Sequence, residues 1–395
     1  METSLTAYDM FARSANFFPH EPAVIFIDKT GGRFFYCYKQ LLLETNRYMR
    51  SFSWAGIKKG DRIVLLLPNS PRFVKSYLAL SKIGAIPVLV NPALPSERIS
   101  RIIEDTKPRY LIKEGDPDLA QTEGGMSAKV PCDGAEVPCD GNDTSVILYS
   151  SGTTGEQKGV ELTVDNLYHN IRATTALTGI TPRDRSLCFL PLTHCFGLNF
   201  VMGSCFHAGA TLVLHEKFDA SRVLESLVRD GVTMFFAVPM IYKLFLRQHI
   251  DPAFFATVRY FFYAADALSE NAIREWERHY GRTIYTGWGL TETSPFATSN
   301  HQLIHKPGSV GKPIPGVEIK IRKEGYEPSG IGEICVRGHN VMKGYWNQPE
   351  ATAEAIDTDG WFHTGDAGVV DADDHIFVVG RLKDMIDVGG EKAWP

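Results

Sequence analysis

The sequence lacks the features of a membrane or secreted protein. No apolar run approaches the roughly 18 residues that a membrane span requires. The first residues, Met1–Ser4, show neither the basic stretch nor the apolar core of a secretory signal. The seven cysteines are scattered without a C-x-x-C pair, which indicates reduced thiols rather than a disulfide framework. We therefore expect a cytoplasmic protein with no transmembrane segment.

The sequence also lacks the excess of positive charge that nucleic-acid binding needs. The chain of 395 residues carries a formal net charge of −5, so we expect no nucleic-acid partner. A chain of this length is too long for a single hydrophobic core. Two or three subdomains are therefore expected.

Short apolar runs alternate with segments of helical period through the first 290 residues or so. One example is the strand-like run Arg62–Leu67, followed by a helical segment at 73–82 and a second run at Ala85–Val90. This rhythm is typical of parallel, doubly wound sheets. Beyond residue 300, glycine and proline become frequent and the apolar runs become short. We predict an α/β fold with two doubly wound, mostly parallel subdomains and a small β-rich subdomain, a distorted barrel, with boundaries at 1–175, 176–300, 301–383 and 384–395.

One loop concentrates the groups that bind phosphate. The stretch Tyr149–Gly159 holds three glycines, four aliphatic hydroxyls and one lysine in eleven residues, directly after the apolar run 146–148. A strand that leads into such a loop offers N–H groups, hydroxyls and a cation to a polyphosphate. It is not a P-loop, because Gln157 precedes the lysine and Gly159 follows it. The alternative is a flexible surface loop. The candidate phosphate ligands are Ser150, Ser151, Gly152, Thr153, Thr154, Gly155 and Lys158.

Four more segments carry groups suited to a nucleotide and an acid. Gly287–Glu292 combines an aromatic ring, a hydroxyl and a carboxylate, which can stack on a base, bind a phosphate oxygen and hold Mg²⁺. The segment 361–366 ends in a carboxylate able to accept both ribose hydroxyls, and 380–384 contains two cations. His194 stands in the apolar segment 191–197. Taken singly, each segment also fits a turn or a core residue.

Taken together, in this order, these segments resemble the adenylate-forming superfamily of acyl-CoA synthetases, peptide-synthetase adenylation domains and luciferases. The resemblance runs from about residue 8 to residue 395. It implies that a small-molecule carboxylic acid attacks the α-phosphorus of ATP to give acyl-AMP and pyrophosphate. A thiol, of coenzyme A or of a carrier protein, then displaces AMP. ATP/AMP, Mg²⁺ and coenzyme A are thus the implied ligands.

The resemblance also implies roles for individual residues. Lys158 and the hydroxyl loop suit the β- and γ-phosphates, Thr291 suits the α-phosphate and Glu292 suits the metal. Together with His194, these form the expected catalytic set. Trp288 stands where many relatives carry tyrosine on one face of adenine, and Asp366 with Arg381 would hold the ribose. The remaining expected nucleotide contacts are Ala265, Asp266, Ala267, Gly287 and Lys383.

The acid is expected to be apolar. Amino-acid-activating relatives carry an aspartate after the phenylalanine of the His194 segment, whereas Gly197 follows Phe196 here, so no buried anion awaits a substrate ammonium. Small residues at Ala264, Gly287 and Gly289 are expected to leave room for an apolar tail. The fatty acyl-CoA ligase branch is favoured; an aryl-CoA ligase, an acyl-AMP ligase and a non-catalytic nucleotide-binding module are the alternatives. The expected acyl-pocket residues are His194, Phe196, Gly197, Val238, Ala264, Gly289 and Leu290.

The sequence departs from the family pattern in three places. Gln157 replaces the usual proline of the phosphate loop, and Tyr263 stands where a small residue is common. In the family, a further mobile domain follows the G-R-x-K-D hinge and supplies a lysine for adenylation, whereas this sequence stops at Trp394-Pro395. We therefore expect the large domain of a ligase, which binds ATP and an acyl-AMP mimic and makes little acyl-CoA, since thioester formation needs rotation about Lys383.

Overall fold

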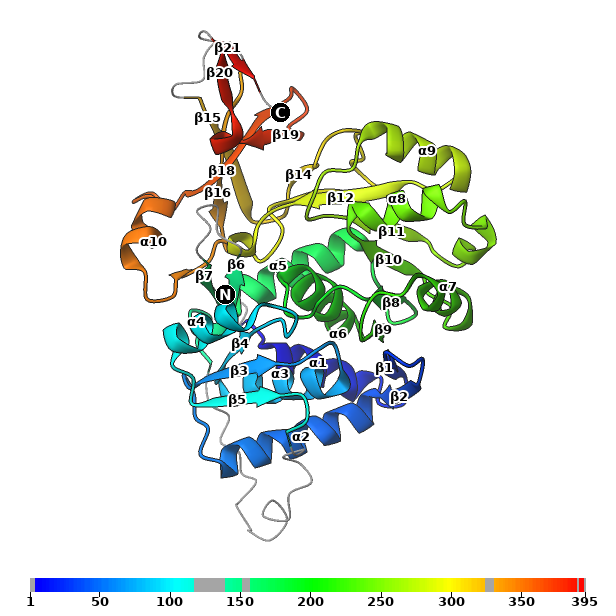
Figure 1. Ribbon diagram of the computed structural model, residues 1–395, viewed down its shortest axis with the longest axis vertical. Helices are drawn as coiled ribbons and strands as arrows, with labels where there is room; N and C mark the ends of the chain where they lie inside the picture. Colours follow the sequence, from blue (N-terminus) through cyan, green and yellow to red (C-terminus); the bar gives the residue numbers. More distant parts are fainter. Residues whose placement is uncertain (1–3, 117–138, 151–156, 324–329, 389–390, 394–395) are drawn as a thin grey trace.

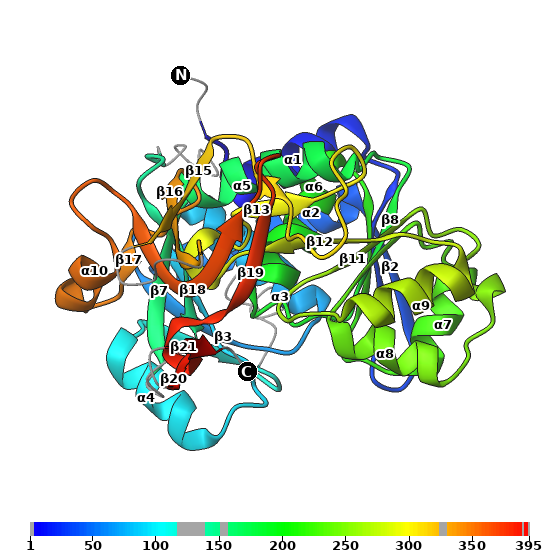
Figure 2. The same ribbon diagram turned by 90° about the horizontal axis from the view of Figure 1, so that it is seen from above.

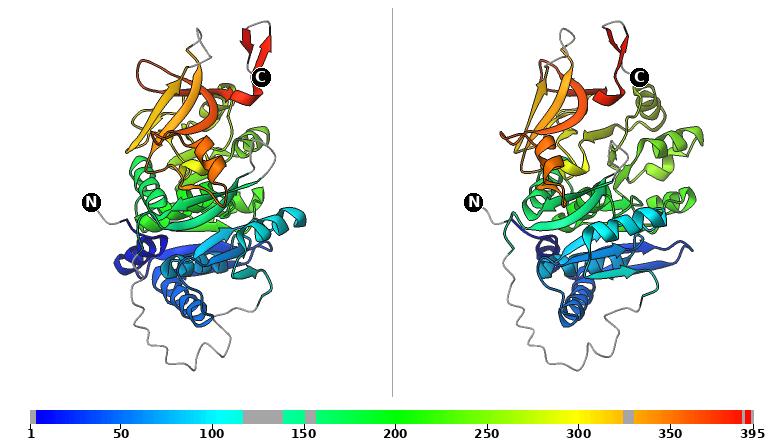
Figure 3. Two further views of the ribbon diagram at one scale, coloured as in Figure 1. Left: turned by 90° about the vertical axis from the view of Figure 1, so that its left-hand side faces the viewer. Right: turned by 60° about the vertical axis from the view of Figure 1, so that its left-hand side comes forward.

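Two large sheets with helices between them form the body of the molecule, and a smaller antiparallel sheet stands at one end (Figures 1 and 3). The computed structural model describes residues 4–116, 139–150, 157–323, 330–388 and 391–393. The strands of both large sheets are mostly parallel. This confirms the predicted α/β class with a separate β-rich part.

The larger sheet has nine strands in the order β14-β13-β12-β11-β10-β8-β9-β1-β2. Its central strands run parallel, and antiparallel strands close both edges. The central strand Met234–Ala237 is buried along its whole length, as expected for a strand covered on both faces. The strands are β1 Pro22–Ile27, β2 Arg33–Cys37, β8 Arg185–Cys188, β9 Thr211–His215, β10 Met234–Ala237, β11 Tyr260–Tyr263, β12 Ile284–Trp288, β13 Thr298–Asn300 and β14 Lys312–Pro313.

The second sheet has six strands in the order β17-β7-β6-β4-β3-β5. The two predicted strands and the helix between them are present as β3, α3 and β4. The helix starts at Pro71, because the Ser70 side chain accepts a hydrogen bond from Phe73 N and proline suits the first helical turn. The strands are β3 Arg62–Leu66, β4 Ile86–Leu89, β5 Tyr110–Lys113, β6 Thr144–Ser150, β7 Lys158–Thr163 and β17 Gly344–Tyr345.

Helices form a layer between the two large sheets and cover their outer faces. α7, α8 and α9 lie on the outer side of the nine-stranded sheet (Figure 2). α4 packs Ile102 against the outer face of the six-stranded sheet. The helices are α1 Ala7–Phe17, α2 Tyr38–Trp54, α3 Pro71–Ile83, α4 Ser96–Thr106, α5 Val164–Thr178, η2 Phe196–Gly203, α6 Ser204–Ala208, α7 Ala220–Arg229, α8 Pro239–Arg247, η3 Pro252–Phe255, α9 Glu270–Tyr280, η4 Thr291–Thr293, α10 Pro349–Ala355 and η5 Leu382–Asp384.

The small sheet is antiparallel throughout and has the order β15-β16-β18-β19. A separate hairpin, β20–β21, follows it. The predicted domain boundaries at 175 and 300 stay predictions. Both large sheets contain strands from either side of such a boundary, because β1 and β2 belong to the nine-stranded sheet and β17 belongs to the six-stranded sheet. The strands are β15 Val317–Arg322, β16 Gly332–Gly338, β18 Phe362–Val370, β19 Ile376–Arg381, β20 Ile386–Val388 and β21 Glu391–Ala393.

Among the described residues, no helix combines the length and the apolar character needed to cross a bilayer.

Candidate nucleotide and acyl site

The predicted site residues of the nine-stranded sheet gather at one edge. Strands β10, β11 and β12 are adjacent and parallel, with Ala237 opposite Tyr263 and Tyr263 opposite Thr286. Their carboxyl ends therefore lead into Val238, Ala264 and the loop 288–292 at the same edge. This is where ligands bind in open parallel sheets.

The turn after β11 is predicted to line adenine. Ala264 is buried, whereas Ala265, Asp266 and Ala267 are exposed. Ala265 has a φ of 75°, a left-handed conformation that is uncommon for a residue with a Cβ and often marks functional turns. The Asp266 carboxylate accepts a hydrogen bond from Ala267 N at 2.7 Å. The turn thus keeps its backbone accessible beside the strand ends.

The loop 288–292 is tied to the small sheet through Asp366. The indole Nε1 of Trp288 donates to Asp366 Oδ2 at 2.9 Å, and Arg381 Nε lies 2.7 Å from Asp366 Oδ1. Asp366 and Arg381 face each other on β18 and β19. Burial raises the pKa of Asp366, against the opposing effects of the Arg381 charge and the Trp288 hydrogen bond. We call these three residues the Asp366 bridge.

The same loop is tied to the six-stranded sheet through Tyr345. The Tyr345 hydroxyl donates to Glu292 Oε1 at 3.1 Å, and Lys158 Nζ lies 4.7 Å from the centroid of the tyrosine ring. Glu292 is only 7% exposed, and burial raises its pKa while the Tyr345 hydrogen bond, Arg381 and Lys158 act in the opposite direction. Burial and the nearby carboxylate raise the pKa of Tyr345, so the phenol keeps the proton it donates. We call Lys158, Tyr345 and Glu292 the Tyr345 bridge.

The predicted phosphate loop joins two antiparallel strands. Ser150 ends β6 directly opposite Lys158, which begins β7. The loop residues between them, 151–156, lie outside the described part of the chain, so the predicted roles of Ser151, Gly152, Thr153, Thr154 and Gly155 stay predictions. Thr291, half-buried, begins the short turn η4, and Lys383 is exposed in η5 after β19.

Close backbone contacts explain three of the predicted glycines. A Cβ on Gly289 would lie 1.9 Å from Pro295 O, one on Gly287 would lie 2.8 Å from Thr298 O, and one on Gly197 would lie 2.5 Å from Pro191 O. The chain's own backbone occupies the space where each side chain would stand. Their small size lets two segments approach each other, and the expectation that Gly287 and Gly289 also leave room for an acyl tail stays a prediction.

Aromatic side chains fill the region expected to surround the acid. His194 is exposed, and its carbonyl accepts from Leu198 N at 2.9 Å where the π-helix η2 begins. π-helical turns are frequent at functional sites. Val238 and Leu290 are half-buried. Phe196 belongs to a group of buried rings with centroids 4.7 to 6.2 Å apart. We call this group the aromatic cluster: Phe196, Phe200, Phe236, Phe262 and Phe296.

Three buried asparagines hold the loop that follows Glu292, and sequence reasoning missed them. Asn170 and Asn340 both donate to Thr293 O and Phe296 O, at 2.8 to 3.4 Å. Asn199 donates to Ser294 O at 2.6 Å. Asn199 could have been identified from the sequence, because it is a polar residue inside the apolar run Phe196–Met202 and a buried amide needs a hydrogen-bond partner. Nothing in the local sequence marks Asn170, Asn340 or Tyr345.

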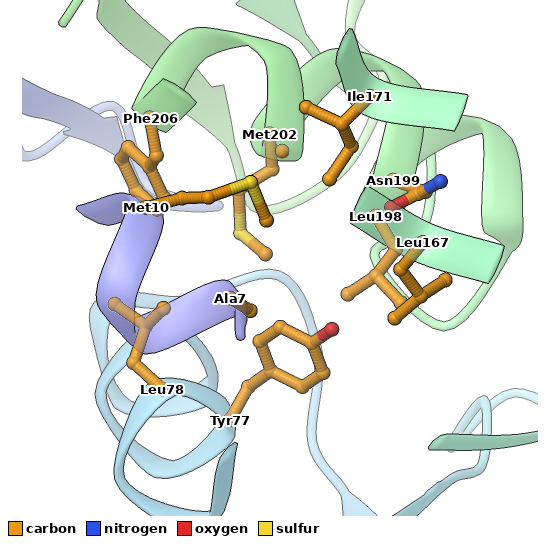
Figure 4. A pocket seen from close by; sticks show the side chains of 11 residues that line it. Ala7, Met10, Tyr77, Leu78, Leu167, Ile171, Leu198, Asn199, Met202 and Phe206 are labelled. Carbon is orange, nitrogen blue, oxygen red and sulfur yellow. The ribbon is translucent and has the colours of Figure 1, made fainter. Parts of the chain in front are cut away.

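An apolar pocket lies between α1, α3, α5 and η2, lined by Met10, Leu78, Leu198 and Met202 among others (Figure 4). Its volume is about 10 Å³, which is about the room for one water molecule. Ligand pockets are usually far larger, at hundreds of Å³. This pocket is therefore a packing gap in the described conformation.

The chain was compared with known proteins. The model of the family described as "AMP-binding enzyme" matches residues 11–346. A feruloyl-CoA synthase from Amycolatopsis sp is 33% identical over 97% of this chain and 80% of the relative, and a 2-succinylbenzoate–CoA ligase from Bacillus pumilus is 34% identical over 95% and 78%. An oxalate–CoA ligase from Arabidopsis thaliana is 32% identical over 88% and 74%.

Solved structures agree with the sequence matches. ATP-bound MatB from Rhodopseudomonas palustris has a TM-score of 0.87 at 27% identity, covering 99% of this chain and 82% of that one. The o-succinylbenzoate CoA synthetase MenE of Bacillus subtilis, in complex with the acyl-adenylate intermediate OSB-AMP, has a TM-score of 0.86 at 27% identity, covering 100% and 82%. The resemblance read from the motifs is confirmed: this chain belongs to the family of AMP-binding enzymes, and its three sequence relatives named above are described as CoA ligases or a CoA synthase.

Proposed function

We propose that this chain binds ATP and a carboxylic acid and takes part in an AMP-forming acid–thiol ligation. A carboxylate oxygen attacks the α-phosphorus of ATP, the bond to the bridging oxygen breaks, and acyl-AMP and pyrophosphate form. The thiol of coenzyme A then attacks the acyl carbon and AMP leaves. The observation that carries this proposal is the convergence of all three sheets on the loop 288–292 through the Tyr345 and Asp366 bridges.

The described residues fit the parts of ATP in a consistent order. Trp288 offers a ring to adenine, and Asp366 with Arg381 offers a carboxylate and a guanidinium to the ribose. Thr291 offers a hydroxyl to the α-phosphate. Lys158 offers a cation to the β- and γ-phosphates. Such donors stabilise the charge that develops on phosphate oxygens during the transfer.

Glu292 fits a magnesium ion. It is a buried carboxylate whose charge is disfavoured by burial, and one of its oxygens is held by a neutral hydroxyl. Mg²⁺ is commonly bound by one or two carboxylates together with substrate phosphates and water. When bound there, the ion would neutralise charge on the triphosphate. Glu292 itself would orient that complex towards the loop.

We further propose an acid with an apolar body. The aromatic cluster surrounds the expected acyl side, and Gly197 carries no carboxylate for an ammonium. The relatives' names support an aryl acid, through feruloyl-CoA synthase and 2-succinylbenzoate–CoA ligase. The fatty acid favoured from the sequence remains a second candidate, and so does transfer to a carrier-protein thiol. His194 would line the acid rather than act as a base, because a carboxylic acid is already ionised at neutral pH.

Binding of acyl-AMP mimics to the 395-residue chain tests the proposal. Non-hydrolysable acyl-sulfamoyl adenosines should bind at least about a hundredfold more tightly than AMP when their acyl group fits, as intermediate mimics do. Titration calorimetry with cinnamoyl, long-chain acyl and oxalyl analogues would rank the acids. The pair 3-phenylpropionyl and phenylalanyl differs only by an amine and should favour the former. A chain that binds neither AMP, Mg-ATP nor any analogue would refute the proposed function.

A further inference from the structure

A short segment, residues 342–346, links the two residues proposed to handle the triphosphate. Met342 N donates to Glu292 O at 2.8 Å, so the segment holds the backbone of the metal-side residue. Trp346 N donates to Gly159 O at 2.7 Å, and Tyr345 stands opposite Val160 on strand β7. The segment is therefore an edge strand of the sheet that carries Lys158 and, at the same time, an anchor of the loop 288–292.

The side chain of Tyr345, like the backbone of its segment, contacts both the loop 288–292 and strand β7. Its hydroxyl donates to Glu292 Oε1 at 3.1 Å, and its ring face meets Lys158 Nζ at 4.7 Å from the centroid. One aromatic side chain thus contacts a cation with its face and an anion with its edge. The attachment of the backbone on both sides fixes where the ring stands.

The chemistry of the two partners explains why a neutral bridge is useful. A lysine ammonium is a mobile point charge on a flexible stem, and a buried carboxylate attracts it strongly. A direct ion pair between Lys158 and Glu292 would neutralise both groups before a triphosphate and a metal arrive. A tyrosine offers each of them a neutral partner, through a cation–π contact and a hydrogen bond.

We propose that Tyr345 is a positioning residue that holds Lys158 and Glu292 at the separation required by a metal-bound triphosphate. The inference rests on the proposed function, because it assigns those two residues to phosphate and metal. The ring sets the place of the ammonium, and the hydroxyl sets the orientation of the carboxylate. When the metal-bound triphosphate binds, its own contacts with Lys158 and Glu292 replace the cation–π contact and the hydrogen bond of Tyr345.

Two variants separate the two contacts. Tyr345→Phe keeps the ring face and removes the hydroxyl, so the Mg²⁺ concentration needed for half-maximal ATP binding should rise about tenfold, with AMP affinity unchanged. Tyr345→Leu removes both contacts. It should show the same magnesium defect and a further loss of ATP affinity relative to AMP, because Lys158 loses its place. A residue that only supports the fold would lower ATP and AMP affinity alike.

The chain offers a matched control in Tyr8. Tyr8 lies on helix α1, in another part of the fold. Its hydroxyl donates to Asn46 Oδ1 at 2.8 Å, and Lys82 Nζ lies 5.0 Å from the centroid of its ring. Tyr8→Phe and Tyr8→Leu remove the same kinds of contact and should leave the magnesium dependence unchanged. Thermal unfolding of all four variants shows which fraction is folded in each titration.

Variants of the partners separate failure of this inference from failure of the proposed function. If Lys158→Ala and Glu292→Gln leave Mg-ATP binding unchanged, the proposed function is wrong at this site. If they weaken binding while both Tyr345 variants behave like the Tyr8 controls, Tyr345 has no positioning role. The inference also expects Lys158→Ala and Tyr345→Leu to be non-additive in ATP affinity, since they remove one shared contact; strict additivity would contradict it.

Discussion

The part of the candidate site proposed to bind the nucleotide, here called the nucleotide side, and the part proposed to bind the acid, here called the acyl side, are built in different ways. On the nucleotide side, the Tyr345 and Asp366 bridges join three sheets by single polar contacts between partly or fully buried groups. On the acyl side, the aromatic cluster packs ring against ring without a polar contact among its side chains. Individual residues therefore define the nucleotide side, whereas collective packing defines the acyl side.

This difference separates binding chemistry from stability. A polar contact on the nucleotide side contributes little to folding, because protein–protein hydrogen bonds largely replace bonds to water. A ring of the aromatic cluster contributes much to folding, because it fills space and removes apolar area from water. Substitutions on the nucleotide side should therefore weaken ligand binding, whereas substitutions on the acyl side should lower the free energy of unfolding.

The largest expected effect comes from opening the aromatic cluster. Phe200 is 2% exposed and contacts four other rings of the cluster. Phe200→Ala should lower the free energy of unfolding by about 3–5 kcal/mol and leave AMP affinity of the folded fraction nearly unchanged. Urea unfolding measures this, with Phe17→Ala, which alters a ring that is 68% exposed, as control. A loss below about 1 kcal/mol would mean that the cluster is loosely packed.

Lys158, the cation of the nucleotide side, should show the reverse result: its substitution should affect ligand binding and leave stability nearly unchanged. Lys158→Ala should change unfolding free energy by less than about 0.5 kcal/mol. It should weaken Mg-ATP binding by about 1.5–3 kcal/mol, the usual worth of a hydrogen bond to a charged group. Calorimetric titration measures the binding, and Lys243→Ala on the exposed surface of α8 is the control. Unchanged affinity would remove Lys158 from the site.

The buried asparagines should couple to each other. Asn170 and Asn340 donate to the same two carbonyls, so each variant to alanine should cost only about 1 kcal/mol while the other amide still serves them. The double variant should cost more than the sum, because the carbonyls then lose both donors. Chemical unfolding of the two single variants and the double variant gives the coupling. A purely additive cycle would show that each amide acts alone.

The smallest expected effect is a gain in stability. Burial raises the pKa of Glu292, so the folded, unliganded chain loses stability as the pH rises from the ordinary glutamate pKa to the raised one, and the loss is complete above the raised pKa. Glu292→Gln should stabilise the chain by about 1 kcal/mol at pH 8, lose the advantage at acid pH where Glu292 is protonated, and weaken magnesium-dependent ATP binding. Thermal unfolding at both pH values measures this. A less stable variant at pH 8 would show that the charge is well solvated.

The motifs predicted much of the fold and part of the site. The run Arg62–Leu67 and the helical segment after it are present as β3 and α3, because continuous apolar runs and a serine–proline start are local signals. The resemblance to the family assigned Val238, Ala264 and the loop 288–292 to one site, and the structure places them at the same edge of the nine-stranded sheet. The roles assigned to these residues stay predictions until ligand binding is measured.

The sequence alone determined the family, the α/β class and the kinds of group offered to a nucleotide, because these depend on residue type and order along the chain. Only the tertiary structure decided which groups touch. It alone placed Tyr345 between Lys158 and Glu292, tied Trp288 to Asp366, and set a backbone carbonyl against Gly289. The physical reason is that hydrogen bonds and close packing act over a few ångströms in space, between segments whose separation in sequence carries no signal.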